Sequence, residues 1–230
     1  MSVAENIRNV RQNIDAALAR SGRNKGSVKL VAVSKNVPEN KILEAYASGQ
    51  RAFGENRVQE WQQKSVLLPA DCEWHIIGRL QTNKVKYLDA RIAFIHSLDR
   101  LSLLEKFNEE GKKLSLIWKT LVQVNVAGDE AKAGLEIDEV KDFLITAKNY
   151  SYVKILGLMT IGVLAVSPQE TRGYFRKLRE IRDQLLREGI CCHQSFFHLS
   201  MGMSQDYELA VEEGATIVRI GSTIFGDGIT

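Results

Sequence analysis

The sequence predicts a (β/α)8 barrel, in which eight parallel strands alternate with helices around a closed core. Two observations carry the prediction. Short apolar segments typical of buried parallel strands alternate with segments whose apolar residues recur at helical spacing, and eight such strand segments fit within 230 residues. One extra helical segment precedes the first strand. No Pro- or Ser-rich linker interrupts the chain, so residues 1–230 are expected to form a single domain. An open doubly wound sheet is the alternative architecture.

The N-terminal segment predicts an amphipathic helix that Gly22 ends. Acidic residues, Glu5 and Asp15, interrupt this segment, which excludes a signal peptide. No apolar run in the chain approaches the roughly 20 residues that a membrane span needs. The apolar positions of the helix are Val3, Ile7, Val10, Ile14 and Leu18.

The predicted strands are mostly continuous apolar runs, as expected for strands buried on both faces. The first run ends in a lysine, the second is the weakest because it is so short, and the fifth is the longest. In chain order, the strands are expected at residues 29–34, 51–54, 73–78, 92–97, 115–126, 153–159, 195–200 and 216–221.

Proline, glycine and capping residues predict the helix boundaries. Pro38 suits the first turn of the helix after the first strand. The helix after the sixth strand has the clearest start, since Ser167 and Glu170 form a capping box around Pro168 at the first helical position, and Gly189 ends it. The other helical segments are expected at about 56–67, through 84–87, around 101–107, and at 137–147 and 204–213.

Composition narrows the class of protein. Hydrophobic residues make up 44% of the chain and charged residues 26%, and the net charge is only +3, which does not favour nucleic-acid binding. The three cysteines, Cys72, Cys191 and Cys192, are odd in number and form no C-x-x-C motif. Neither a disulfide framework nor a zinc cluster fits them, and reduced thiols in the cytoplasm are the expected state.

Lys35 directly follows the first strand, at the end of the barrel where active sites form. The residues alone leave two interpretations open. The commoner one is a solvated lysine at a strand end. The other is an amine in a pocket that attacks a carbonyl and forms a Schiff base.

Arg219 interrupts a strand that is expected to be buried, so it needs a partner. That partner is either a carboxylate elsewhere in the barrel or an acceptor on a ligand. Gly221, Ser222 and Thr223 follow directly and can turn backbone N–H groups toward an anion. Because phosphate sites recur after strands seven and eight of such barrels, Ser200 at the end of strand seven is placed to add a hydroxyl.

Six motifs closely resemble, in order, those of the pyridoxal phosphate homeostasis proteins, also described as proline synthetase co-transcribed homologues. That family is similar to the barrel domain of alanine racemase, a fold-type III barrel. The resemblance covers about residues 30–226. The motifs are A-V-S-K, F-G-E-N-R-V-Q-E, W-H-I-I-G-R-L-Q-T-N-K, G-L-M-T-I-G, L-S-M-G-M-S-Q-D and V-R-I-G-S-T-I-F-G.

The resemblance implies pyridoxal 5′-phosphate (PLP) as the cofactor, together with its contacts. Lys35 would form the internal aldimine, and Arg219 would face the pyridine nitrogen. The other implied contacts are Gly221, Ser222 and Ser200 at the phosphate, with Asn56 and Met159 near the ring.

Two further positions of these motifs have no assigned cofactor contact. The family usually has tyrosine where this chain has Arg57, so a contact made by that tyrosine is not carried over to this chain. His75 lies in a family motif, but a structural histidine is expected there, and also at His96 and His193.

The resemblance and the chemistry favour a protein that holds PLP as a lysine aldimine and serves intracellular PLP homeostasis without robust turnover. An arginine does not readily give up a proton, so a ring nitrogen facing Arg219 stays unprotonated and is a poor electron sink. Similar racemases take a second base, a tyrosine, from an additional C-terminal β-domain, and this chain ends four residues after Gly226.

The alternatives are a PLP-dependent amino-acid racemase or related enzyme of low activity, a cofactor-free Schiff-base aldolase, and a nucleic-acid binder. The expected partners are PLP and PLP-dependent apoenzymes that receive it, with no nucleic acid and no membrane. A monomer is expected.

Overall fold

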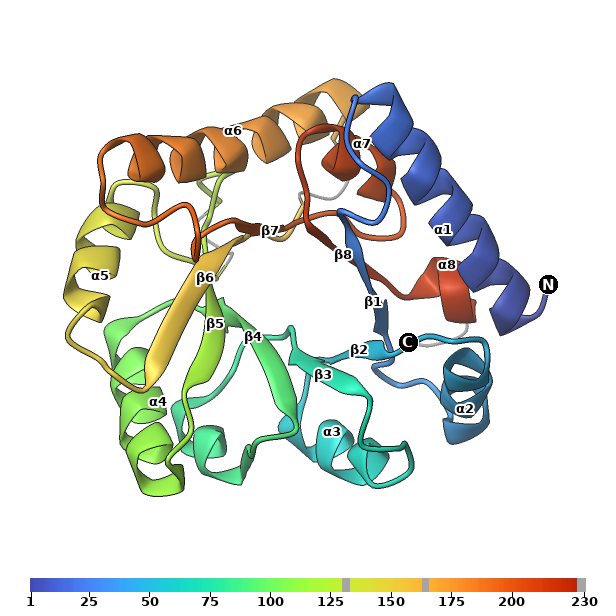
Figure 1. Ribbon diagram of the computed structural model, residues 1–230, viewed down its shortest axis with the longest axis horizontal. Helices are drawn as coiled ribbons and strands as arrows, with labels where there is room; N and C mark the ends of the chain where they lie inside the picture. Colours follow the sequence, from blue (N-terminus) through green and yellow to red (C-terminus); the bar gives the residue numbers. More distant parts are fainter. Residues whose placement is uncertain (130–132, 163–165, 227–230) are drawn as a thin grey trace.

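Strand β8 (Ile217–Ile220) pairs with strand β1 (Lys29–Val33), and this pairing closes a sheet of eight parallel strands into a barrel. The computed structural model describes residues 1–129, 133–162 and 166–226. Each strand neighbours the next one in chain order, and helices surround the ring of strands on the outside (Figure 1). The predicted (β/α)8 barrel with an extra N-terminal helix is therefore confirmed.

Most strands lie within two residues of the predicted bounds, and β5 and β7 are shorter by three residues or more. Strand β5 begins at Trp118 because Ser115 takes the left-handed conformation, with φ of 51°, at the end of the preceding helix. Strand β7 begins at His198 because the N–H groups of Ser195 and Phe196 bond to the Cys192 carbonyl in a turn. The remaining strands are β2 (Ala52–Glu55), β3 (Glu73–Ile76), β4 (Ile92–Leu98), β5 (Trp118–Gln123), β6 (Val153–Met159) and β7 (His198–Ser200).

The helices follow the predicted order, and two departures matter for the site. A short 3-10 helix, η1 (Thr82–Tyr87), follows β3, and α7 begins at Tyr207 rather than at residue 204, which leaves an irregular loop after β7. No helix within the described part of the chain is long and apolar enough to cross a membrane. The helices are α1 (Val3–Arg20), α2 (Glu39–Ala47), α3 (Val58–Ser65), α4 (Leu101–Leu114), α5 (Glu139–Ala147), α6 (Pro168–Arg187), α7 (Tyr207–Glu212) and α8 (Ser222–Phe225).

Helix α1 lies outside the barrel along the seam where β8 meets β1, beside α7 and α8 (Figure 1). The predicted apolar positions of α1 are all buried, and Ser2 and Glu5 form a capping box at its start. The Asn6 amide donates to the Ile224 carbonyl of α8 at 2.9 Å. Asn13 donates to the Tyr207 hydroxyl of α7, also at 2.9 Å. The extra helix therefore fixes the two short helices that follow β7 and β8.

The core has two parts. A large outer part lies between strands and helices and includes the three tryptophans. A smaller part fills the barrel, since its members face inward from alternate positions of the strands. The inner apolar residues are Val31, Ala52, Phe94, Leu121, Leu156, Met159 and Ile217.

Gly157 in β6 is required by the close approach of β7. A Cβ atom at this position would lie 2.0 Å from the His198 carbonyl oxygen. We expect Gly157→Ala to lower the free energy of unfolding by at least about 3 kcal/mol, because the backbone of β7 must shift. Gly173→Ala in α6 is the control, since its Cβ would meet nothing within 4 Å and should stabilise the helix by about 0.5–1 kcal/mol. Urea unfolding followed by circular dichroism measures both; equal midpoints would contradict the expectation.

Candidate functional site

A pocket of about 740 Å³ opens at the carboxyl ends of the strands, the face where barrels of this kind carry their sites. Its walls come from the loops after β1, β2, β3, β6, β7 and β8, and from α6 and α7. The predicted residues that line it are Lys35, Asn56, Arg219, Gly221 and Ser222.

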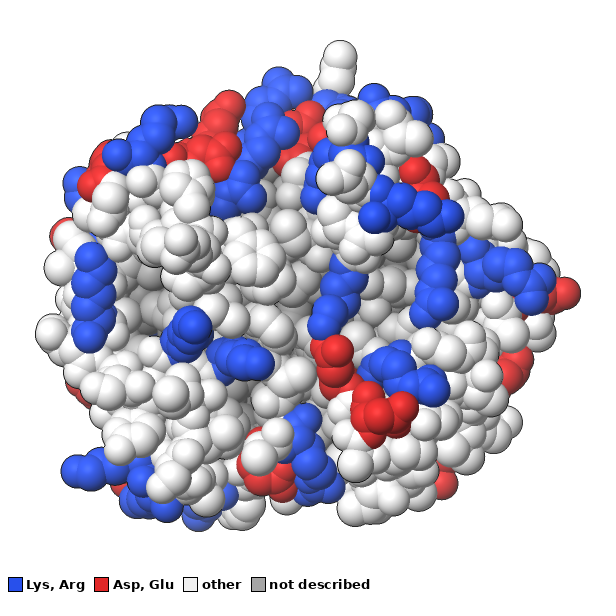
Figure 2. Space-filling model, viewed as in Figure 1, with Lys and Arg blue, Asp and Glu red and all other residues white. Residues whose placement is uncertain are grey.

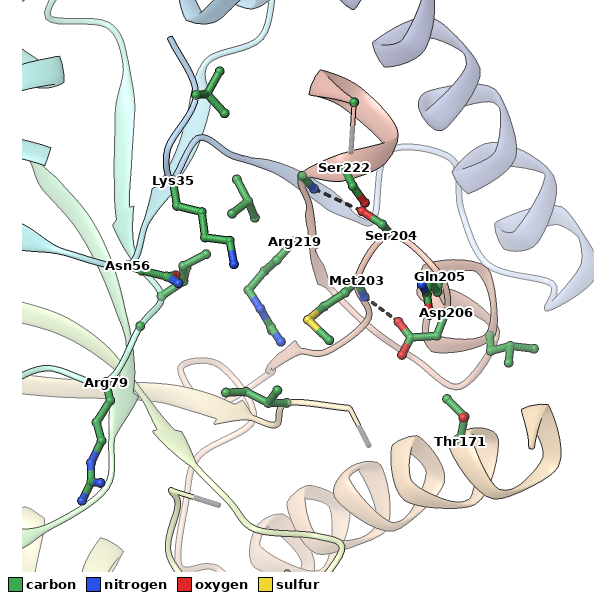
Figure 3. Close-up of a pocket in the computed structure, with 18 of the residues that line it drawn as sticks. Lys35, Asn56, Arg79, Thr171, Met203, Ser204, Gln205, Asp206, Arg219 and Ser222 are labelled. Atoms are coloured by element: carbon green, nitrogen blue, oxygen red, sulfur yellow. Dashed lines mark hydrogen bonds between the residues drawn. The ribbon is translucent and has the colours of Figure 1, made fainter. Parts of the chain in front are cut away.

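Lys35 stands in the turn after β1, and its side chain extends into the pocket toward Arg219 (Figure 3). The residue is exposed, and among the described residues its amine has no recorded hydrogen-bond or ion-pair partner. Strand β1 pairs with β8, and Val31 lies opposite Arg219 in the register. Lys35 and Arg219, which are far apart in the sequence, therefore share one wall of the pocket. The amine is thus accessible to a ligand.

A buried group of charges holds the turn that carries Lys35. The Lys64 ammonium donates to the Ser34 carbonyl at 2.5 Å and to the Glu55 carboxylate at 2.9 Å. Glu60 accepts from the Asn36 N–H at 2.9 Å, and Asn36 has a left-handed φ of 56°. The residues on both sides of Lys35 are therefore fixed by side chains of β2 and α3. We call Glu55, Glu60 and Lys64 the turn clamp.

The Glu55 carboxyl has no solvent exposure. Burial raises its pKa, and hydrogen bonds from Ser34 and Lys64 oppose that rise. One carboxyl oxygen, Oε1, takes both bonds, while Oε2 has no partner among the described residues. The clamp therefore depends on Lys64, the cation that compensates this carboxyl.

Arg219 of β8 lines the pocket and is only 4% exposed. Its guanidinium donates to the Ser200 hydroxyl at 2.5 Å and to the Thr160 carbonyl at 2.8 Å. Both acceptors are neutral, and no carboxylate of the described residues lies within ion-pair distance. Burial lowers the pKa of Arg219 to about 10, with Asp206 opposing the shift, so the group stays protonated at neutral pH. The Arg219 side chain also forms part of the pocket wall (Figure 3).

A cradle of backbone N–H groups forms where β8 runs into α8. The N–H groups of Gly221 and Thr223 both donate to the Ser204 hydroxyl oxygen, at 3.3 and 3.4 Å; the first of these two bonds is drawn at Ser204 in Figure 3. Ser222 begins α8, so its N–H has no acceptor within the helix. A Cβ atom on Gly221 would lie 3.3 Å from the Val33 Cβ, which accounts for glycine where β8 ends against β1. The Gly221 and Thr223 donors therefore converge on one oxygen atom.

Two predicted site residues do not reach the pocket wall. Ser200 is fully buried behind Arg219 and accepts its hydrogen bond. Met159 lies in the apolar core of the barrel. Both are inward-facing residues at strand ends, and Arg219 covers them.

Ser204, four positions beyond Ser200, takes the place in the cradle that the sequence analysis gave to Ser200. The signal for it was present in the same L-S-M-G-M-S-Q-D motif, because ligand contacts in this fold come from the loops after the strands.

The loops after β2 and β3 pack closely against each other beside Lys35. A Cβ atom on Gly78 would lie 2.6 Å from the Asn56 carbonyl oxygen, so glycine lets Asn56 sit against the pocket. Arg57, which replaces the usual tyrosine, is exposed at the start of α3 and is absent from the pocket walls among the described residues. Arg79 contributes to the rim, but its side chain turns away from Lys35 toward Asp99 (Figure 3).

The fold and the pocket define the class of protein. The sequence model described as alanine racemase, N-terminal domain, matches residues 6–228. An alanine racemase from Clostridium difficile shares the fold, with a TM-score of 0.74 at 16% identity, over 98% of this chain and 58% of that one.

Relatives with higher sequence identity identify the family to which the chain belongs. The chain is 46% identical to the pyridoxal phosphate homeostasis protein of Aquifex aeolicus, over 99% of each chain. It therefore belongs to the family of pyridoxal phosphate homeostasis proteins, as the motifs predict. PipY of Synechococcus elongatus, whose structure has been solved with PLP bound, is 35% identical, with a TM-score of 0.84 over 98% of this chain and all of that one.

Three histidines lie inside the barrel beneath the pocket. His75 stacks on Phe94, and His198 meets the same ring edge-on. His75 and His96 are fully buried. Burial lowers the pKa of all three, to about 4 for His198 and well below the usual value for His96. These rings are therefore neutral in the folded protein at neutral pH.

The turn clamp should be important for stability. We expect Lys64→Met to lower the free energy of unfolding by about 3 kcal/mol, because it leaves the buried Glu55 carboxyl without its cation. Lys113→Met removes two ion pairs of α4, with Glu109 and Glu110, whose lysine side chain is 56% exposed, and should cost about 1 kcal/mol or less in total. Urea unfolding compares the two variants, and equal losses would show that the clamp is no stronger than a surface pair.

The buried histidines predict a loss of stability in mild acid. An unfolded histidine titrates near pH 6.5, whereas these pKa values are lower in the fold. Below pH 6.5 the unfolded chain therefore binds more protons, and stability falls as the pH drops toward 4. We expect a loss on the order of 2 kcal/mol by pH 5, measured by urea unfolding across that range.

Variants test the source of this pH dependence. His96→Gln should flatten the profile, because it removes one of the buried titrating groups. His193→Gln, at an exposed position, should leave it in place. A wild-type profile that is flat between pH 7 and 5 would contradict the assignment.

Proposed function

We propose that this chain binds PLP covalently through Lys35 and serves PLP homeostasis. The observation that carries the proposal is the shared pocket: an accessible amine, a buried arginine and a cradle of backbone N–H groups line one cavity. Condensation of the Lys35 amine with the PLP aldehyde forms one C=N bond and releases one water molecule. The solved PLP complex of PipY, a relative over the whole chain, supports the same cofactor.

The cradle suits the phosphate of PLP. Gly221 and Thr223 already direct their N–H groups at an oxygen, that of Ser204, and the start of α8 adds the Ser222 N–H. Such convergent donors bind phosphate oxygens. A phosphate here would compete with the Ser204 hydroxyl for these N–H groups, and the hydroxyl can turn to donate to the phosphate.

Arg219 suits the other end of the ligand, the ring nitrogen. Its guanidinium is held from behind by Ser200 and Thr160, so its free N–H groups are directed toward the pocket. A protonated arginine donates a hydrogen bond and leaves the ring nitrogen unprotonated, which weakens the ring as an electron sink. The geometry favours a protein that holds and releases PLP over one that turns over amino acids.

The remaining parts of the proposal concern the cell. We infer that the protein works in the cytoplasm as a monomer and passes PLP to PLP-dependent apoenzymes. Its charge supports neither a nucleic-acid nor a membrane partner: the net charge is +3, and acidic side chains lie among the basic ones on the face in Figure 2.

A trapping experiment tests the covalent link. Purified protein with PLP should show a visible aldimine band that borohydride removes, and peptide mapping should find the reduced adduct on Lys35. Lys35→Ala should abolish the band and remain folded, because the side chain is exposed and packs little. Lys86→Ala changes an exposed lysine outside the pocket walls and should keep the band. A wild-type protein that stays colourless with excess PLP would contradict the proposal, as would an adduct on another lysine.

Amino-acid racemisation is the competing function. A racemase needs a second base on the opposite face of the substrate, and no tyrosine is found among the described residues of the pocket walls. We expect no interconversion of D- and L-amino acids by the PLP-loaded protein in a chiral chromatography assay. Turnover that disappears in Lys35→Ala would overturn the carrier function and favour the enzyme.

A further inference from the structure

A chain of buried polar side chains runs through the interior of the barrel, from the pocket to the opposite mouth. It starts at Arg219 and passes through Ser200, His96 and His75 to Glu73, the first residue of β3. The strands run parallel, so Glu73 lies at the mouth away from the pocket. None of the three middle residues lines the pocket among the described residues, and a function confined to the pocket walls does not account for them.

The contacts along this chain are short. Arg219 donates to the Ser200 hydroxyl at 2.5 Å, Ser200 lies 2.8 Å from His96 Nδ1, and His96 Nε2 lies 2.8 Å from His75 Nδ1. The last ring nitrogen, His75 Nε2, is buried without a hydrogen bond and faces the Glu73 carboxylate at 3.8 Å. The Glu73 side chain is 45% exposed, and a small rotation would bring its carboxylate within hydrogen-bond distance of His75 Nε2.

Chemistry assigns a direction to these hydrogen bonds. Arginine only donates, so Ser200 accepts from it and is free to donate its own proton to His96 Nδ1. His96 then carries its proton on Nε2 and donates to His75 Nδ1. His75 in turn carries its proton on Nε2, which faces Glu73.

The opposite direction is unfavourable at both ends. Ser200 would accept from both Arg219 and His96, which leaves its own proton without an acceptor in this chain. At the other end, an unprotonated His75 Nε2 would face a carboxylate, two acceptors against each other. The His75 contact, with the ammonium of Lys29, lowers the pKa of Glu73 to about 2, so the chain ends on a negative charge at neutral pH.

The position of this chain of hydrogen bonds bears on the charge of Arg219. Arg219 is a buried cation without a carboxylate in ion-pair distance among the described residues, and such a charge needs compensation. Aligned hydrogen bonds in a low-dielectric interior polarise one another. A negative charge at the far mouth is thereby coupled, bond by bond, to the guanidinium at the pocket.

We propose that His75, His96 and Ser200 are positioning residues, which form a one-way chain of hydrogen bonds from Arg219 to Glu73 and so fix the Arg219 guanidinium as a donor to the ligand. The chain itself is a property of the ligand-free protein. Its effect on the ligand rests on the proposed function, since it requires that Arg219 contacts PLP.

The direction of the chain is tested first, without ligand. Nitrogen-15 NMR of the histidine rings at pH 7.5 distinguishes the two neutral tautomers, and His96→Gln assigns the signals. We expect both His75 and His96 to carry the proton on Nε2. An Nδ1–H tautomer at His96, or a charged ring there, would overturn the proposal.

The role of the far carboxylate is tested next with a matched pair of variants. Glu73→Gln and Lys29→Met both break the same ion pair at the mouth, but only Glu73→Gln removes the charge that ends the chain. Both side chains are partly exposed, at 45% and 38%, so both proteins should fold. We expect Glu73→Gln to shift the His75 tautomer signals and to raise the Kd for PLP roughly three- to tenfold, while Lys29→Met leaves both near the wild type.

Equal tautomers and equal PLP affinity in these two variants would overturn the proposal. That outcome differs from failure of the proposed function, in which the wild-type protein itself would bind no PLP. Even then, the tautomers of the ligand-free wild type and of Glu73→Gln would decide whether the chain exists.

Discussion

The pairing of β8 with β1 is the constraint on which the rest of the structure depends. It closes the sheet, and it brings the two ends of the sequence into one wall of the pocket. Lys35 follows β1, Arg219 lies in β8, and Gly221 follows β8. The extra helix α1 packs along this seam and bonds to α7 and α8, so the closure is reinforced from outside where the pocket needs it.

The residues that bear the polar groups of the pocket are held in place at two levels, one near the surface and one inside the barrel. Near the surface, the turn clamp holds the backbone on either side of Lys35, because Lys64 and Glu60 bond to Ser34 and Asn36. Inside the barrel, Ser200 and Thr160 hold Arg219. The backbone around Lys35 and the guanidinium of Arg219 are thus both held by groups that do not line the cavity. A ligand meets an arginine and a lysine backbone whose positions are already fixed, which reduces the entropy lost on binding.

The support for Arg219 also explains the unusual interior of this barrel. An arginine that donates to neutral acceptors keeps its charge available to a ligand, whereas a direct ion pair would use it. The histidines extend the neutral acceptors away from the pocket toward the Glu73 carboxylate, while Asp206 is the carboxylate whose charge acts on the pKa of Arg219. The apolar residues around Phe94 surround this chain, and the exclusion of water strengthens its hydrogen bonds.

The sequence alone determined the barrel, the order of its elements and five residues of the pocket. Continuous apolar strands and clear helix caps, such as that of Ser167, depend on short-range patterns, and the motifs identified Lys35, Asn56, Arg219, Gly221 and Ser222. Only the tertiary structure decided how deeply each residue is buried. Ser200 and Met159 end strands as predicted, but they face the barrel axis and do not line the pocket. Ser204 lies in the cradle instead of Ser200. It also decided the partners of Arg219, the turn clamp and the contacts of His75 and His96. These contacts join different strands across the barrel, and their geometry depends on the closed register, which no local pattern encodes.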